Sequence, residues 1–142
     1  VLALQNIRDS SAALAEVGRV LVPGGRFVLI LNHPCFRVPK RSGWDFDDKK
    51  SVQYRRVEGY LSEAMIEIDM EPGKGGYGTK TVSFHRPLQL YFKQLQKQGF
   101  LVRRLEEWES NKKSEPGLRQ KAEDVSRKEI PLFMMIEAVK QR

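Results

Sequence analysis

The N-terminal part of the chain has the hydrophobic pattern of a strand, a helix and a second strand. Residues 1–6 begin with an uninterrupted apolar run, which predicts a short buried strand. Asp9 or Ser10 can cap a helix that extends to about Leu21 and carries apolar residues on one face. A Pro-Gly-Gly turn follows, and the apolar run at 26–32 predicts a strand that is covered on both faces. This order predicts a parallel, right-handed βαβ unit.

The pattern changes after the second of these strands. Residues 33–53 combine prolines, a glycine and dense charge, which predicts a long loop or lid. Residues 64–70 and 79–84 alternate between apolar and polar positions. A glycine-rich turn at 73–78 separates them, so the two segments are predicted to pair as a β-hairpin.

The C-terminal part adds a helix and two strands. Pro87 and the apolar residues that follow it at helical spacing predict an amphipathic helix, which Gly99 ends. Strands are predicted at 100–108 and 132–139, with a short helix near 118–128 between them. These elements predict an α/β fold, and 142 residues fit a single domain.

Composition narrows the class of protein. The hydrophobic share of 40% can support a core, and no apolar run approaches the roughly 20 residues that cross a bilayer. The opening residues do not resemble a secretory signal. The single Cys35 excludes an internal disulfide framework and a cysteine-cluster metal site, so a reducing, cytoplasmic compartment is expected. No cluster of His, Cys, Asp and Glu has metal-ligand spacing, and no metal is expected.

The net charge of +7 raises the question of an anionic partner such as a nucleic acid. The basic residues are interleaved with acidic ones, for example Lys49 and Lys50 beside Asp47 and Asp48. This interleaving favours a solvated surface of mixed charge over a nucleic-acid footprint. A nucleic-acid partner is therefore not favoured.

Residues 19–25 read Arg-x-Leu-x-Pro-Gly-Gly and join the predicted helix to the strand at 26–32. This phrase resembles the one that leads from a helix into strand five in the second half of class I S-adenosylmethionine-dependent methyltransferases. Residues 98–102 and 132–136 match the step into strand six and the antiparallel strand seven. The resemblance implies a partial Rossmann-like sheet of strands four to seven. Residues 33–84 would then be an inserted cap that contains the β-hairpin.

The chain also departs from the family pattern. The family's glycine-rich loop after strand one and the acidic residue that ends strand two belong upstream of the matching part. We therefore expect a C-terminal portion of a longer protein, with weak or absent binding of S-adenosylmethionine by these residues alone. The unpaired edge of the 1–6 strand predicts a homo-oligomer, or dependence on the missing N-terminal half.

Ligands of open parallel sheets lie beyond the carboxyl ends of the strands. This rule places Gln5, Asn6, Asn32 and His33 at one edge. The resemblance implies that Gln5 and Asn6 lie beside the methionine part of the cofactor. An imidazole titrates near neutrality, so His33 is the candidate catalytic base for a hydroxyl acceptor; alternatively, it hydrogen-bonds only within its own turn.

The substrate-binding candidates are Asn32, Tyr60, His85 and Arg86. Packing is the alternative for Tyr60 and His85. Arg37, Arg55 or Arg86 could hold an anionic group of a substrate, and a solvated guanidinium is the alternative for each.

Three functions remain open at this point. The first is methyl transfer from S-adenosylmethionine to a small-molecule acceptor, as part of a longer protein. The second keeps the methyltransferase and makes RNA the acceptor. The third is a truncated remnant that catalyses nothing and acts as an oligomerisation module. A fold resemblance does not identify the acceptor.

Overall fold

The computed structural model describes residues 1–70 and 79–141. Their elements, in chain order, are η1 (Leu4–Asn6), α1 (Ser10–Val20), β1 (Arg26–Asn32), β2 (Ser42–Asp47), β3 (Val52–Val57), β4 (Ala64–Asp69), β5 (Lys80–His85), α2 (Leu88–Lys97), β6 (Phe100–Trp108), α3 (Gln120–Glu129) and β7 (Phe133–Lys140).

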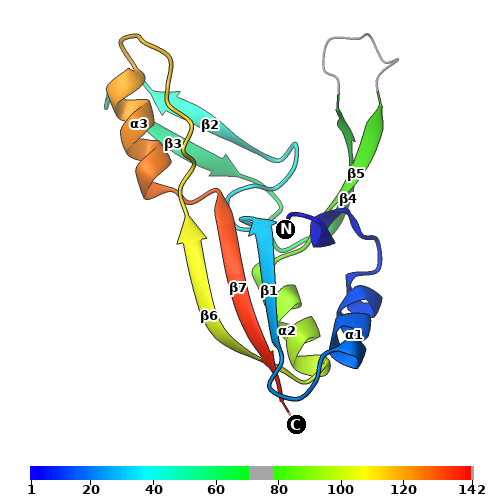
Figure 1. Ribbon diagram of the computed structural model, residues 1–142. Coiled ribbons are helices and arrows are strands. Elements are labelled where there is room, and N and C mark those ends of the chain that lie inside the picture. Colours follow the sequence, from blue (N-terminus) through cyan, green and yellow to red (C-terminus); the bar gives the residue numbers. More distant parts are fainter. Residues whose placement is uncertain (71–78, 142) are drawn as a thin grey trace.

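A three-stranded sheet with the order β1-β7-β6 forms the centre of the molecule (Figure 1). The last strand, β7, runs antiparallel to both of its neighbours. Alternate residues of β1 and β7, such as Leu31 and Met134, point to the face that α1 and α2 cover. Leu14 of α1 and Leu95 of α2 are fully buried there. Burial of these side chains against one face of the sheet therefore supplies the core.

Both ends of α1 are satisfied by polar contacts. The Asp9 carboxylate accepts a hydrogen bond from the Ala12 N–H at 2.8 Å, as an N-cap does. At the other end, the Lys140 ammonium donates to the carbonyls of Gly18 and Leu21 at 2.6 and 2.7 Å. A cation at a helix C-terminus also opposes the negative end of the helix dipole. The last residue of β7 is thereby tied to the first helix.

Two further antiparallel strand pairs lie at the end of the sheet to which β1 points (Figure 1). The pairing of β4 with β5 confirms the hairpin strands expected at 64–70 and 79–84. The turn expected at 73–78 lies outside the described residues. Helix α3 packs beside β3, and the Ser126 hydroxyl donates to the Gln53 carbonyl at 2.7 Å.

The prediction of a loop or lid over 33–53 was wrong for its second half. β2 and β3 pair over six residues each, from Ser42 opposite Val57 to Asp47 opposite Val52. The Asp47 carboxylate accepts from the N–H groups of Lys49 and Lys50, and these bonds stabilise the turn between the strands. The charge density that suggested a loop belongs to this turn and to the solvent-facing positions of the hairpin.

The prediction of a strand at 1–6, parallel to β1, was also wrong. A single backbone hydrogen bond, from the Leu2 N–H to the Ile30 carbonyl at 2.8 Å, joins this segment to β1. The chain then turns into η1, which puts the buried Leu4 into the core. One backbone hydrogen bond to one neighbour is too few for a ladder, and of the apolar residues in this segment only Leu4 is buried.

The other predicted elements are confirmed with small shifts of their ends: the short polar helix begins at Gln120, and the last strand extends to Lys140. The expectation that the strand at 26–32 is covered on both faces was wrong, because the helices cover one face only and Val28 on the other face is 52% exposed. The α/β class is confirmed as well. Within residues 1–70 and 79–141, no helix has the length and apolar character needed to span a membrane. The same residues contain no group of His, Cys, Asp and Glu that could hold a metal ion.

Candidate binding site at the carboxyl end of β1

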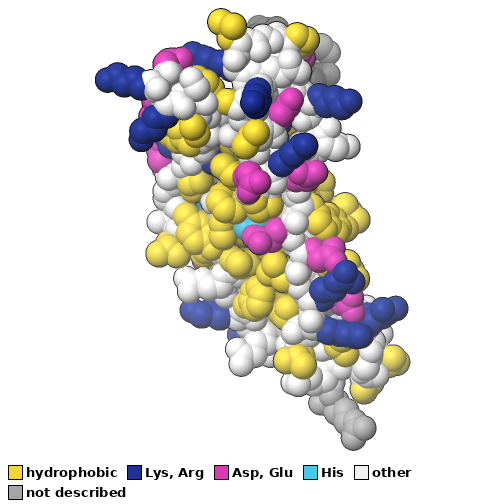
Figure 2. All heavy atoms as spheres, turned by 90° about the vertical axis from the view of Figure 1, so that its left-hand side faces the viewer, with side chains coloured by type: hydrophobic (Ala, Val, Ile, Leu, Met, Phe, Trp, Pro, Cys, Tyr) yellow, Lys and Arg dark blue, Asp and Glu magenta, His cyan; other side chains and the backbone are white. Residues whose placement is uncertain are grey.

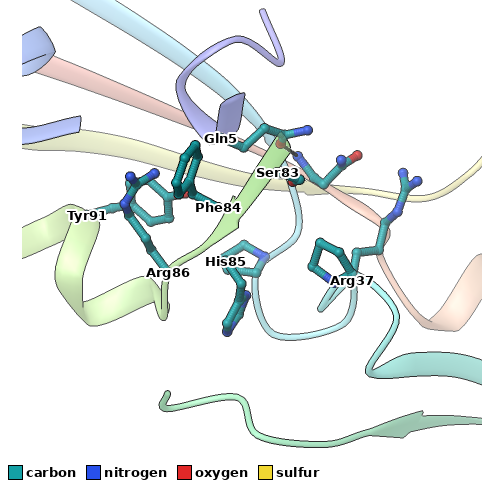
Figure 3. Close-up of a pocket in the computed structure, with 10 residues that line it drawn as sticks. Gln5, Arg37, Ser83, Phe84, His85, Arg86 and Tyr91 are labelled. Carbon is teal, nitrogen blue, oxygen red and sulfur yellow. Dashed lines mark hydrogen bonds between the residues drawn. The ribbon is translucent and has the colours of Figure 1, made fainter. Parts of the chain in front are cut away.

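A cavity of about 390 Å³ opens where β1 ends. Its walls come from η1, the end of β1, the segment that leads into β2, and strands β3, β4 and β5. A smaller hollow of about 20 Å³ adjoins it and shares five residues with it: Gln5, Asn32, Arg37, Pro39 and Ser83 (Figure 3). The larger volume is within the range that small-molecule sites occupy.

Three amide side chains lie at the cavity wall. Gln5, Asn6 and Asn32 all line it, although only Asn32 ends a strand and the other two residues lie in η1. The Gln5 Oε1 accepts a hydrogen bond from the Asn32 N–H at 3.1 Å, which fixes η1 against the end of β1 (Figure 3). Because the carbonyl side of Gln5 is used in this way, its NH₂ group is the part that can serve a ligand.

The cations of the cavity wall are Arg37, Lys40 and Arg55, and no residue that lines the wall within the described chain carries a carboxylate. The Arg55 Nε donates to the Phe36 carbonyl at 2.7 Å, and its Nη2 donates to the Ser42 hydroxyl at 3.0 Å. Burial lowers the pKa of Arg37. Burial also lowers the pKa of Arg55, and the charge of Arg37 lowers it further. The two guanidinium groups are therefore close enough to repel each other.

His33 lies outside the cavity lining and is 2% exposed. The Cys35 N–H donates to its Nδ1 at 3.2 Å, so the ring proton resides on Nε2, which donates to Glu107 Oε1 at 2.7 Å. Both ring nitrogens are engaged, and this geometry does not support the expected role of catalytic base. The His33 carbonyl accepts from the N–H groups of Phe36 and Arg37, so the residue holds the turn that carries Arg37.

Of the other predicted substrate-binding residues, His85 and Arg86 line the small hollow, and Tyr60 lines neither space. The His85 Nε2 donates to the Tyr60 carbonyl at 2.7 Å, while the Tyr60 hydroxyl accepts from the first N–H of α2, that of Leu88. These two side chains therefore join β5 and α2 to the 58–63 segment.

The Arg86 guanidinium is buried, and it is bound to backbone rather than open to a ligand. Its Nη2 donates to the carbonyls of Ile7 and Arg8 at 2.8 and 2.6 Å. Its charge also opposes the effect of burial on Tyr91, whose pKa is raised, by burial first of all. Figure 3 shows Arg86 and Tyr91 together on one side of the hollow, with Arg37 on the other.

The larger cavity is also lined by four residues that were not among the candidates from sequence: Lys40, Ser42, Thr81 and Ser83. Ser42 belongs to the hairpin that was interpreted as a loop, and its pairing brings Arg55 back to the cavity. The alternation of Trp44 and Phe46 with polar neighbours was the available signal for that hairpin.

Neither a protein-family model nor a curated protein matches the chain. Two solved structures resemble it over nearly its whole length: an S-adenosylmethionine-dependent methyltransferase from Mesorhizobium loti, at 26% identity and TM-score 0.70, and a putative one from Listeria monocytogenes, at 25% identity and TM-score 0.72. The match covers 98% and 99% of this chain and 59% of each of those chains, so this chain spans less than two thirds of either protein.

A third structure, the glycopeptide N-methyltransferase MtfA in complex with S-adenosylmethionine, matches at 16% identity and TM-score 0.52. The match covers 99% of this chain and 51% of that one. At this identity the likeness concerns the fold. Together, the three structures support a class I methyltransferase fold for the chain.

Proposed function

We propose that the chain forms the acceptor-binding, C-terminal part of a methyltransferase that uses S-adenosylmethionine and acts on a small molecule. The observation that carries the proposal is the cavity of about 390 Å³ at the carboxyl end of β1, in a chain with a methyltransferase fold. In open α/β sheets, ligands bind beyond the carboxyl ends of the strands. The two hairpins, β2–β3 and β4–β5, supply walls of that cavity, and we propose that they act as its cap.

The described residues do not fit the complete cofactor. Its ribose hydroxyls are commonly held by a carboxylate in nucleotide-binding sheets, and no described residue of the cavity wall carries one. Within residues 1–70 and 79–141, no glycine-rich turn joins a strand to a helix N-terminus in the manner that holds the charged part of a nucleotide. The Gly24–Gly25 turn leads in the other direction, from a helix into a strand. The proposal therefore assigns the cofactor pocket to the remainder of a longer protein.

The residues of this chain have the task of binding and orienting the acceptor. Positioning supplies a large part of the acceleration in a transfer between two bound molecules. Gln5 and Asn32 contribute amide groups to the cavity wall, and Arg37 and Arg55 contribute guanidinium groups. In the proposed enzyme Gln5 and Asn6 lie on the side of the acceptor that faces the cofactor.

The alternative of an RNA acceptor has less support. Figure 2 shows lysine and arginine side chains interspersed with aspartate and glutamate on the displayed face, around a band of hydrophobic side chains. A nucleic-acid surface would gather positive charge along one track. Several cations are also paired, among them Arg119 with Asp48 at 2.8 Å.

A transfer assay tests the proposal. The reading frame that contains Val1, with any sequence that precedes it, is expressed and incubated with S-adenosylmethionine labelled in its methyl group, together with a pool of small carboxylates, phosphate esters and hydroxyl compounds. We expect label in the small-molecule fraction. Label in added RNA alone would favour the alternative acceptor, and the absence of both transfer and cofactor binding would contradict the proposal.

A further inference from the structure

The cavity wall contains two guanidinium groups that have no carboxylate partner within the described residues. Arg37 and Arg55 both line the cavity, and neither takes part in any of the ion pairs of residues 1–70 and 79–141. Lys40 adds a third positive charge to the same wall. Elsewhere in the described chain, some surface arginines form ion pairs, as Arg19 does with Glu16, and others such as Arg26 do not; what distinguishes Arg37 and Arg55 is that they share one cavity wall.

Arg55 is held in place by its neighbours. Its Nε and Nη2 are bound to the Phe36 carbonyl and to the Ser42 hydroxyl, and its guanidinium lies over the Trp44 ring at 5.1 Å from the centroid. A guanidinium has five N–H donors, so these two bonds leave the others available. A group fixed in this way loses little conformational entropy when a ligand binds.

Arg37 is placed by the backbone of its turn. Its N–H donates to the His33 carbonyl at 2.8 Å, and its guanidinium lies over the Phe133 ring at 5.1 Å from the centroid. No side-chain hydrogen bond of Arg37 is present within the described residues. Its planar array of donors therefore lines the cavity without an acceptor among the described residues.

Bringing two like charges together in a half-buried wall is costly unless an opposite charge arrives. Burial lowers the pKa of both arginines, and for Arg55 the charge of Arg37 adds to the effect. An anionic ligand would remove this repulsion and satisfy the free donors at the same time. Guanidinium groups match the oxygens of carboxylates and phosphates with paired hydrogen bonds.

We infer that Arg37 and Arg55 together bind an anionic oxygen group, a carboxylate or a phosphate, and that the small molecule held in this cavity carries such a group. The inference rests on the proposed function in one respect, since it takes that small molecule to be the methyl acceptor. The anion site itself needs only Arg37 and Arg55 and does not depend on methyl transfer.

Binding of inorganic phosphate to residues 1–142, followed by NMR at constant ionic strength, tests the inference. The Nε–Hε signals of Arg37 and Arg55 should shift and saturate with phosphate, whereas added chloride should leave them in place. Acetate in a parallel titration distinguishes the two chemistries, because the tighter of the two anions identifies the group. Arg37→Gln should weaken binding by about tenfold or more, the effect of losing a charged hydrogen bond.

Lys49→Gln is the matched control, since it removes one charge from the exposed turn at the far end of the β2–β3 hairpin and leaves the cavity unchanged. Its affinity for phosphate should stay within about twofold of the original chain, as expected for an exposed charge in salt. Arg55→Lys keeps the charge and most of the local packing, and should give an intermediate affinity. Shifts that do not saturate, or equal losses in Arg37→Gln and Lys49→Gln, would overturn the inference.

The two proposals fail separately. Saturable phosphate binding without methyl transfer by the longer protein would leave the anion site intact and overturn the proposed function. Methyl transfer with no phosphate or acetate binding would support the function and overturn the anion site.

Discussion

The imidazole of His33 is held at both ring nitrogens, and this arrangement determines its role. Nδ1 accepts from the Cys35 N–H, Nε2 donates to Glu107, and the ring packs against Phe36 with 4.8 Å between the ring centroids. Its carbonyl receives the N–H of Arg37. His33 is thus a positioning residue that connects β6 to the turn beside the cavity.

Replacement of His33 by alanine should lower the free energy of unfolding by about 1–3 kcal/mol, because the Cys35 N–H loses its buried acceptor and packing is lost. Glu107→Gln keeps an acceptor for Nε2–H on a half-exposed side chain, and should cost under about 1 kcal/mol. Urea unfolding of both variants gives the comparison. An unchanged midpoint for His33→Ala, or a larger loss for Glu107→Gln, would contradict this role.

The residues that could be predicted from sequence at this scale are those at the ends of elements. Asn32 lines the cavity because it ends β1, and that rule needs no knowledge of distant contacts. Gln5 and Asn6 line it as well, although they lie in η1 and not at the end of a strand. The contacts of His33 with Glu107 and of Arg86 with the Ile7 carbonyl join residues more than 70 positions apart. The pattern of hydrophobic and polar residues along the chain contains no information on contacts between residues so far apart. The roles of His33 and Arg86 therefore could not be predicted.

At the scale of elements, the end of α1 depends on a residue at the other end of the chain. Lys140→Gln removes the ammonium that binds the Gly18 and Leu21 carbonyls, and should lower the free energy of unfolding by about 1 kcal/mol or slightly more. Lys93→Gln, on the exposed face of α2, is the control and should change it by less than about 0.5 kcal/mol. Equal midpoints for the two variants in urea would contradict the assigned contact.

Helix α3 is joined to the preceding segment through Asp124, which accepts from the Ser114 N–H at 3.1 Å. Hydrogen bonds from Ser114, first its hydroxyl and then its backbone, hold the pKa of Asp124 below its ordinary value of 3.8. A lowered pKa in the folded state stabilises the fold above that ordinary value, and this contribution is lost as the pH falls through the lowered value.

Asp124→Asn should therefore be less stable than the original chain at neutral pH, and the difference should shrink as the pH falls below 3.8. Urea unfolding at a series of pH values measures it. Glu129→Gln, on the same helix, controls for the loss of a carboxylate. A difference that stays constant down to pH 2 would contradict this linkage.

The elements that could be predicted are those whose own sequence encodes their boundaries. Asp9 and the Pro-Gly-Gly turn delimit α1, and Gly99, with a φ of 74°, ends α2 in the left-handed conformation that glycine tolerates. Residues 1–6 have the composition of a strand but only one backbone–backbone hydrogen bond to β1. The β2–β3 hairpin was missed because its turn and outer positions are charged, which concealed its alternation.

For the whole molecule, the sheet has one covered and one open face. Val28 of β1 and Leu101 of β6 are 52% and 58% exposed, on the face opposite the two helices. Beyond β1, the single hydrogen bond from Leu2 leaves most of that edge without a backbone partner in the described residues. Open edges and exposed apolar faces favour association.

We expect residues 1–142 to self-associate, and Val28→Lys to reduce that association, because a charge on the open face opposes contact between copies. Sedimentation velocity over a range of concentrations measures it. Lys93→Gln lies on the outer surface of α2, away from the open face of the sheet, and this variant should associate like the original chain. A monomer at high concentration in the original chain would contradict the expectation.

The central claim is that this chain supplies the acceptor side of a methyltransferase and lacks a complete cofactor pocket. Calorimetric titration with S-adenosylmethionine tests it most directly, on residues 1–142 and on the protein extended by any upstream sequence of the same reading frame. We expect no saturable binding in the micromolar range by residues 1–142, and saturable binding by the extended protein. Saturable micromolar binding of S-adenosylmethionine to residues 1–142 alone would contradict the claim.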